Sequence, residues 1–203
     1  MKHKMTISLR LGITATALLF IASSILDCNR PVPTGYETYT LNDKGISHFS
    51  FDYPARFIVR QVQFLDNPSF ERVDLDGPYS KQTRDRTTIW VVAQQYPAAT
   101  TVADLLQSSL TTASGLPGYQ LLDRSLTTAG GITAEQIVYF YYSQRSDYET
   151  RVLGFKPAPT VTREVFFSYN NLFWTMGMSS DQSTADSDAL DFERVLQTLQ
   201  MLP

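Results

Sequence analysis

The sequence predicts an α+β fold, in which an antiparallel sheet is flanked by helices on its faces. Aromatic and polar residues alternate over residues 49–53, as in a strand with one buried face. Apolar residues over 102–110 recur at the spacing of one helix face, and a second such stripe lies near the end of the chain. Gly130-Gly131 and Asn170-Asn171 are typical of hairpin turns. Strands joined by hairpins and interrupted by two helices indicate the α+β class.

The beginning of the chain has the composition of an export signal. Lys2, Lys4 and Arg10 precede an apolar run over residues 11–26, which is shorter than a typical membrane span. The only cysteine in the sequence, Cys28, stands just beyond that run. This order of charged, apolar and polar sequence predicts a secretory signal that ends at the cysteine.

The position of Cys28 predicts a lipid anchor, because bacterial lipoproteins are cleaved just before a lipid-carrying cysteine. We therefore expect residues 1–27 to be a signal peptide and the protein to be exported and anchored to the outer face of the cell membrane. Asp27 stands where the lipobox favours a small residue. Two alternatives stay open: cleavage among Ala22, Ser23 and Ser24, or an uncleaved anchor that leaves Cys28 as a free thiol.

Residues 28–45 are rich in proline and polar residues without a helical or strand period, and we expect them to form a tether. The patterned sequence follows, and residues 46–203 are expected to form a single, monomeric globular domain. Loss of the signal peptide removes three basic residues and one acidic residue, which changes the net charge from −3 to −5. An acidic domain without basic runs argues against nucleic acid as a partner.

The elements are expected in the following order. A strand stopped by Pro54 is followed by a second strand, and a third strand, apolar on both faces, is expected in the centre of the sheet. Thr101 and Asp104 fit a capping box that opens the first helix, and Gly115 ends it. Ser183 to Asp186 is the capping signal of the closing helix. The expected strands cover 46–54, 56–64, 88–94, 119–126, 133–142, 161–169 and 172–178, and the closing helix covers 184–201.

The strand from Phe49 to Pro54, followed by the mid-chain helix, the Gly130-Gly131 hairpin and the terminal helix, resembles the PsbP-like family. The resemblance spans about residues 46–202. It implies a Mog1/PsbP-like α/β/α sandwich and a non-enzymatic extracytoplasmic protein of the bacterial lipoprotein branch. The chain departs from the common pattern at Phe57, where a tryptophan often follows the Tyr-Pro pair, and lacks an obvious histidine-based metal site.

The chemical groups of the processed chain are few. His48 is its one histidine. It lies on the polar face of the first expected strand, so we interpret it as a solvated strand residue. Asp74, Asp76 and Gly77 superficially resemble a calcium loop, but the glycine and the twelfth position do not fit, and an acidic surface turn is expected instead. We expect no cofactor and no metal. The acidic residues at the start of the closing helix are expected to complement its dipole: Asp181, Asp186, Asp188 and Asp191.

Three aromatic runs, at 139–142, 166–169 and 173–174, are expected to form cross-strand pairs in the core. A tyrosine-lined groove is the alternative, should one sheet face be incompletely covered by helices.

Two long connections, 65–86 and 143–160, are expected between strands, and such segments often carry function. The first is polar. The second carries a candidate partner-contact site, in which two apolar side chains are flanked by basic ones: Arg151, Leu153, Phe155 and Lys156. In the alternative, these residues fold back onto the sheet edge.

Three function classes follow from these patterns. A membrane-tethered binding or assembly module ranks first, and its partner could be a membrane protein complex. A carrier of a small apolar ligand ranks second. A hydrolase that uses carboxylates alone ranks last, because no acidic pair is placed by sequence for acid and base roles.

Overall fold

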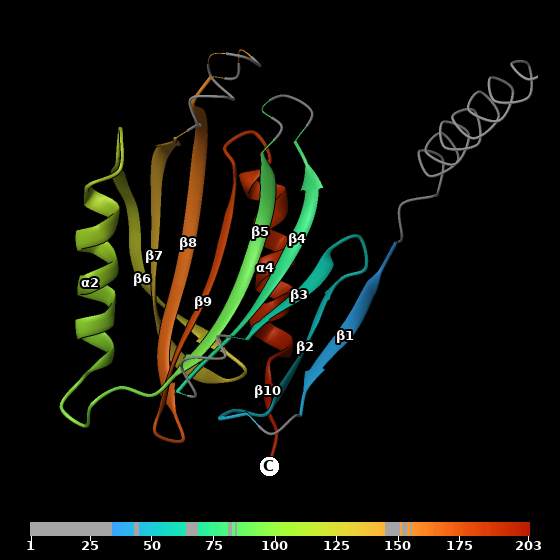
Figure 1. The fold of residues 1–203 in the computed structure, drawn as a ribbon, viewed down its shortest axis with the longest axis vertical. Helices are drawn as coiled ribbons and strands as arrows, with labels where there is room; N and C mark the ends of the chain where they lie inside the picture. The colour runs from blue at the N-terminus through green and yellow to red at the C-terminus, as the bar shows by residue number, and fades with distance from the viewer. Residues whose placement is uncertain are drawn as a thin grey trace, which may run out of the picture. The chain divides into compact units, whose positions relative to one another are not determined.

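Seven antiparallel strands form the main sheet of the fold, in the order β3-β4-β5-β9-β8-β7-β6 (Figure 1). A smaller sheet has the order β1-β2-β10. The computed structural model describes residues 34–42, 45–63, 69–80, 83, 85–144, 151, 154 and 156–203. The strands are β1 Tyr36–Leu41, β2 Phe49–Pro54, β3 Ile58–Gln63, β4 Phe70–Tyr79, β5 Arg86–Gln94, β6 Gln120–Ala129, β7 Ile132–Ser143, β8 Ala158–Tyr169, β9 Leu172–Asp181 and β10 Gln200–Met201; the helices are α2 Val102–Ser114 and α4 Ala185–Thr198.

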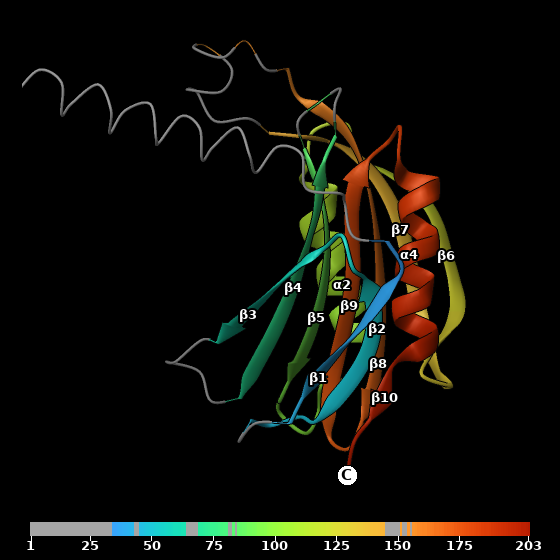
Figure 2. The same ribbon diagram turned by 90° about the vertical axis from the view of Figure 1, so that its right-hand side faces the viewer.

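The largest part of the core lies between the main sheet, helix α4 and strand β2. Trp174 is stacked on Phe167 at 5.9 Å between ring centroids and meets the edge of Phe49 at 5.2 Å. Phe192 and Val195 of α4 belong to the same buried cluster. Figure 2 shows α4 beside β2 and β10. Burial of these large side chains gives this face most of its stabilisation.

Helix α2 packs on residues of β7 and β8. Leu106 of α2 is buried with Ile137 and Phe166. Because successive side chains of a strand point to opposite faces, Phe166 faces away from its neighbour Phe167, which lies in the core under α4. Trp90 of β5 lies on the same face of the sheet as Phe166 and is only half-buried. The class predicted from the sequence, an antiparallel sheet with two helices, is confirmed.

The folded part begins earlier than predicted. Residues 36–41, expected to lie in the tether, form β1 and pair with β2 from Tyr36↔Pro54 to Leu41↔Phe49. Most of β1 is exposed, so its sequence lacks the alternation of a half-buried strand. Tyr39 nevertheless packs on Phe51, at 5.4 Å between ring centroids. The compact unit therefore starts at Thr34.

The connection expected over residues 65–86 contains strand β4. Val73 and Leu75 are fully buried, and the charged residues that alternate with them, Arg72, Asp74 and Asp76, lie on the other face of the strand. Asp76, expected in an acidic surface turn, is 4% exposed and forms ion pairs with Arg60 and Arg86. Strand β4 was missed because the face opposite Val73 and Leu75 carries charged residues, which give the segment the composition of a loop.

Both predicted helices are present, with differences in the capping and in the end of the second one. The capping box of Thr101 and Asp104 is present at α2. At α4 the predicted capping signal is wrong, since the side chain of Thr184 makes no capping hydrogen bond, and Asp181 accepts one from the backbone N–H of Ser183 at 2.8 Å instead. Helix α4 ends at Thr198, and β10 follows it. With 13 and 14 residues, neither described helix is long and apolar enough to cross a membrane.

Candidate ligand groove at the β8–β9 turn

A tight turn at Asn170 and Asn171 joins β8 to β9. Both residues adopt left-handed backbone conformations, with φ of 50° and 60°. Asparagine tolerates this region better than other residues with a side chain, and two such residues in sequence are typical of a two-residue hairpin turn. The turn was predicted correctly, and it brings both amide side chains to the end of the hairpin. Neither amide makes a hydrogen bond to the described part of the chain.

An open cavity of about 680 Å³ lies between this turn and the segment that leads from β5 to α2. Tyr96 and Phe173 meet edge to face in it, with ring centroids 5.5 Å apart. Tyr96 is 38% exposed and Tyr169 is 37% exposed, so both present aromatic surface to solvent. The cavity is lined by Tyr96, Pro97, Ala98, Thr100, Ser168, Tyr169, Asn170, Asn171, Leu172 and Phe173. None of these residues carries a charge at neutral pH.

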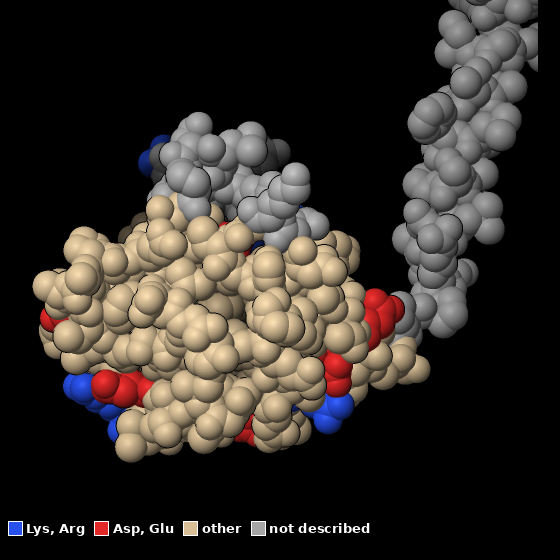
Figure 3. Space-filling view, turned by 90° about the horizontal axis from the view of Figure 1, so that it is seen from below, with Lys and Arg blue, Asp and Glu red and all other residues tan. Residues whose placement is uncertain are grey.

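A second cavity of about 220 Å³ lies on the other side of the turn and shares Tyr169, Asn170 and Leu172 with the first. Trp174 also lines it. We call the two cavities together the turn groove. Figure 3 views this end of the fold and shows acidic and basic side chains at the margins, with uncharged residues across the centre.

Trp174, which lines the smaller cavity, has a buried polar group without a partner among the described residues. The residue is 1% exposed, and its indole nitrogen is buried without a hydrogen-bond partner in the described structure. Buried indole N–H groups usually donate to a partner, because leaving one unpaired costs free energy.

Two other polar groups of the turn groove have defined surroundings. Burial raises the pKa of the Tyr96 phenol above its ordinary value, so its hydroxyl is protonated at neutral pH and can both donate and accept. The Nδ1 atom of His48 lies 3.3 Å from the backbone oxygen of Pro203. His48 precedes β2 and is half-buried in the second cavity, where the sequence predicted a solvated residue on the polar face of the strand.

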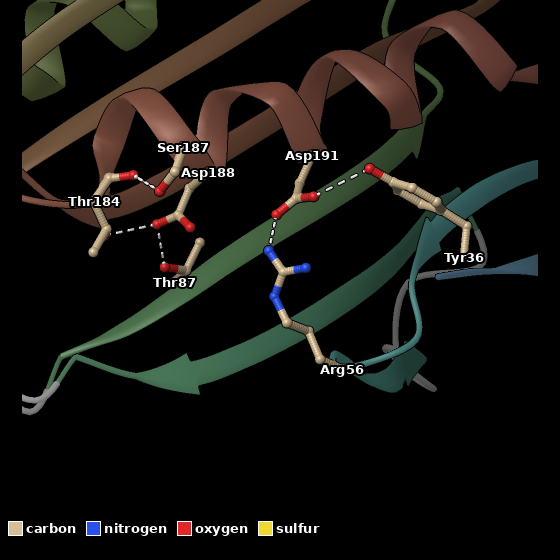
Figure 4. A network of polar contacts seen from close by, with 7 residues as sticks. All are labelled: Tyr36, Arg56, Thr87, Thr184, Ser187, Asp188 and Asp191. Atoms are coloured by element: carbon tan, nitrogen blue, oxygen red, sulfur yellow. Dashed lines mark hydrogen bonds and ion pairs between the residues drawn. The ribbon is translucent and has the colours of Figure 1, made fainter. Parts of the chain in front are cut away.

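The acidic residues of α4 form a structural network (Figure 4). Asp191 is paired with Arg56 and accepts a hydrogen bond from Tyr36 at 3.4 Å. Burial raises the pKa of Asp191 above its ordinary value, while the Arg56 guanidinium acts in the opposite direction. Asp188 accepts from the hydroxyl of Thr87 at 2.7 Å. Asp191 lies too far along the helix to complement the dipole as predicted, and it connects α4 to the β2–β3 turn instead.

Glu164 is a second buried carboxyl group. It lies on the face of β8 that packs against α2, and it accepts a hydrogen bond from the hydroxyl of Ser109. Burial raises the pKa of Glu164 above its ordinary value, and the hydrogen bond from Ser109 offsets only part of this effect. In the described residues, no group of three or more histidine, cysteine, aspartate or glutamate side chains could hold a metal ion.

The predicted partner-contact residues are distributed between described and undescribed parts of the chain. Arg151 and Lys156 are exposed, whereas Leu153 and Phe155 lie outside the described residues, as does Cys28. In the sequence, Arg151 and Lys156 precede β8, and Asn170 and Asn171 follow it. The contact site stays a prediction.

Sequence reasoning missed the turn groove because four separate segments build it, at 45–48, 96–100, 168–174 and 201–203. The expected tyrosine-lined groove lay on the sheet, and the only local signal for the real one was Asn170-Asn171 between two aromatic runs. That signal was interpreted as a turn alone. Tyr96 and Thr100 come from a segment about 70 residues earlier, and no periodic pattern connects the two.

No family model and no curated protein matches the chain. Solved structures do. The chain has a PsbP-like fold. Cyanobacterial PsbP from Synechocystis superposes with a TM-score of 0.51 at 14% identity, over 84% of this chain and 94% of that one. This confirms the PsbP-like fold implied by the resemblance of the sequence.

Two further structures share the PsbP-like fold. LpqN of Mycobacterium tuberculosis, which is involved in cell envelope biogenesis, has a TM-score of 0.52 at 16% identity, over 90% of this chain and 97% of that one. PA94 of Pseudomonas aeruginosa, a protein of unknown function, has a TM-score of 0.52 at 15% identity, over 83% and 98%. At these identities the comparison shows the fold alone.

Proposed function

We propose that this protein is a non-enzymatic binding or assembly module, held at the outer face of the cell membrane by a lipid on Cys28. We further propose that the turn groove is its binding surface and that the PsbP-like fold takes the form of an α/β/α sandwich. The groove carries the proposal, because it combines exposed aromatic rings with hydroxyl groups and two asparagine amides that make no hydrogen bond to the described residues. Concave sites with aromatic walls and a few placed polar groups are the usual form of ligand sites.

The early start of the folded unit supports action close to a membrane. If Cys28 carries the lipid, only residues 29–33 separate it from Thr34, where the compact unit begins. A chain of that length spans at most roughly 20 Å when fully extended. The fold would therefore work beside the lipid headgroups. A structural neighbour that takes part in envelope biogenesis is compatible with such a location.

A carrier of a small apolar ligand is the alternative, and the cavities support it less well. The larger cavity of the turn groove is open and lined by hydroxyl and amide groups as well as rings. An apolar ligand would leave those groups without partners, at a cost in free energy for each one that it removes from water.

The proposal is tested by photo-crosslinking in intact host cells. A benzophenone amino acid at position 169 should form adducts, seen as shifts in mass, and a probe at Tyr142 should not. Tyr142 is a matched control, because it is 45% exposed and lies outside the turn groove. Cys28→Ala in the probe-bearing protein should abolish the adducts if anchoring brings the groove to its ligand. Absence of adducts at position 169, or equal adducts at both positions, would overturn the proposal.

A further inference from the structure

We propose that the turn groove binds a neutral oligosaccharide. This inference rests on the proposed function only in taking the groove as the binding site. Three features of the groove favour this class of ligand: the absence of charged residues from its larger cavity, the kind of hydrogen-bonding groups, and the position of the aromatic rings.

The first feature is charge. The larger cavity is lined by ten residues, and none of them is acidic or basic. Sites for phosphates, carboxylates or acidic peptides usually supply arginine or lysine, since opposite charge is what holds such ligands. A ligand of this cavity gains nothing from a net charge and would lose its hydration on entry. The larger cavity therefore suits an uncharged ligand.

The second feature is the type of polar group. Ser168 and Thr100 contribute hydroxyls, and Asn170 and Asn171 contribute amides; each of these groups can both donate and accept hydrogen bonds. The hydroxyls of a sugar also donate and accept, so they can satisfy both capacities. A proline-rich peptide, the other usual ligand of tyrosine-lined grooves, offers mainly carbonyl acceptors and would leave the acceptor oxygens of the groove unpaired.

The third feature is the arrangement of rings around the turn. Tyr96 and Tyr169 each present a partly exposed ring on which the C–H face of a pyranose can pack. Trp174 adds aromatic surface to the lining of the smaller cavity. A cavity of about 680 Å³ lies within the range of small-molecule sites and has room for a short oligosaccharide.

The test is isothermal titration of the full chain with chitotetraose and with cellotetraose, in a detergent without a sugar headgroup. We expect at least one of the two to bind with a Kd below about 1 mM. Tyr169→Ala and Asn170→Gly should each weaken that binding roughly three- to tenfold, the loss expected for one contact. Glycine keeps the left-handed backbone at position 170 available, so it removes the amide without straining the turn.

Tyr142→Ala is the matched control, because it truncates an exposed tyrosine outside the groove and should leave the affinity unchanged. Melting temperatures of all three variants confirm that they fold. Absence of saturable binding by both sugars, or equal binding by wild type and groove variants, would overturn the inference. Binding of decaproline without binding of either sugar would overturn it in favour of a peptide. If crosslinks form at position 169 in cells while both sugars fail, the proposed function stands and only the ligand class is lost.

Discussion

The tip of the β6–β7 hairpin packs against the end of α4, and two adjacent glycines allow this contact to be measured. Gly130 has φ of 57° and donates its backbone N–H to the carbonyl of Leu196 at 2.8 Å. A Cβ atom at position 130 would come within 3.0 Å of the backbone oxygen of Leu199. Gly131 has φ of 78°, and a Cβ there would have no heavy atom within 4 Å.

The two alanine variants share one cost and differ in another. Both place a side chain in the left-handed region, which costs about 1 kcal/mol. Gly130→Ala adds a clash with backbone that cannot rotate away, at about 1–3 kcal/mol. For a domain of this size, 1 kcal/mol corresponds to about 2–4 °C in Tm. We therefore expect Gly131→Ala to lower Tm by about 3 °C and Gly130→Ala by about 6–12 °C.

Thermal unfolding followed by circular dichroism, with urea unfolding as a second measure, compares the stabilities of the two variants. The difference between the variants isolates the contact with α4, because the backbone cost is common to both. Equal melting temperatures, within about 2 °C, would refute the placement of the hairpin tip against the helix end.

Three further predictions concern buried carboxyl groups and the undescribed loop. Because burial raises the pKa of Glu164, the folded state binds a proton more tightly than the unfolded state, and its stability falls as pH rises above the ordinary value of 4.5. Glu164→Gln should therefore melt higher than wild type at pH 7, with the two curves converging below about pH 4; a difference independent of pH would contradict this. Arg56→Met should lower the free energy of unfolding in urea by about 1–3 kcal/mol, because it leaves the Asp191 carboxylate without its ion-pair partner. Adding Asp191→Asn should recover part of the loss. The double change Leu153→Ser and Phe155→Ser should weaken partner capture without lowering Tm; an early melt would instead place these residues in the core.

Local patterns in the sequence predicted those elements whose two faces differ in polarity. The alternation at Phe49 and Phe51 identified β2, and the Thr101 capping box identified the start of α2. Strand β1 was missed because most of its residues are exposed and its one buried apolar residue, Leu41, gives no period. Strand β4 was missed because a charged residue such as Asp76 is not expected inside a buried strand. Arg60 and Arg86 compensate its charge, but only the folded chain brings them near it.

The candidate site was beyond local patterns for a different reason. Tyr96 and Asn170 gain their role from antiparallel pairing of β5 with β9, which brings distant segments to one end of the sheet. The unpaired indole of Trp174 is likewise a property of its packing, since the sequence shows only an apolar residue in a strand. The cellular location, the lipid on Cys28 and the contact site at residues 151–156 could be stated as hypotheses, because each depends on residues that are contiguous in the sequence.

The most direct test of the turn groove uses the two tryptophans of the chain. Their indole N–H groups give two separate nuclear magnetic resonance signals, one from Trp174 in the groove and one from Trp90, which packs over Gly177 away from it. The soluble glycan fraction released from the host envelope is added stepwise to the protein. We predict that the Trp174 signal shifts and saturates while the Trp90 signal stays in place. A Trp174 signal that does not move, or a shift at Trp90 alone, would contradict the assignment of the turn groove as the binding site.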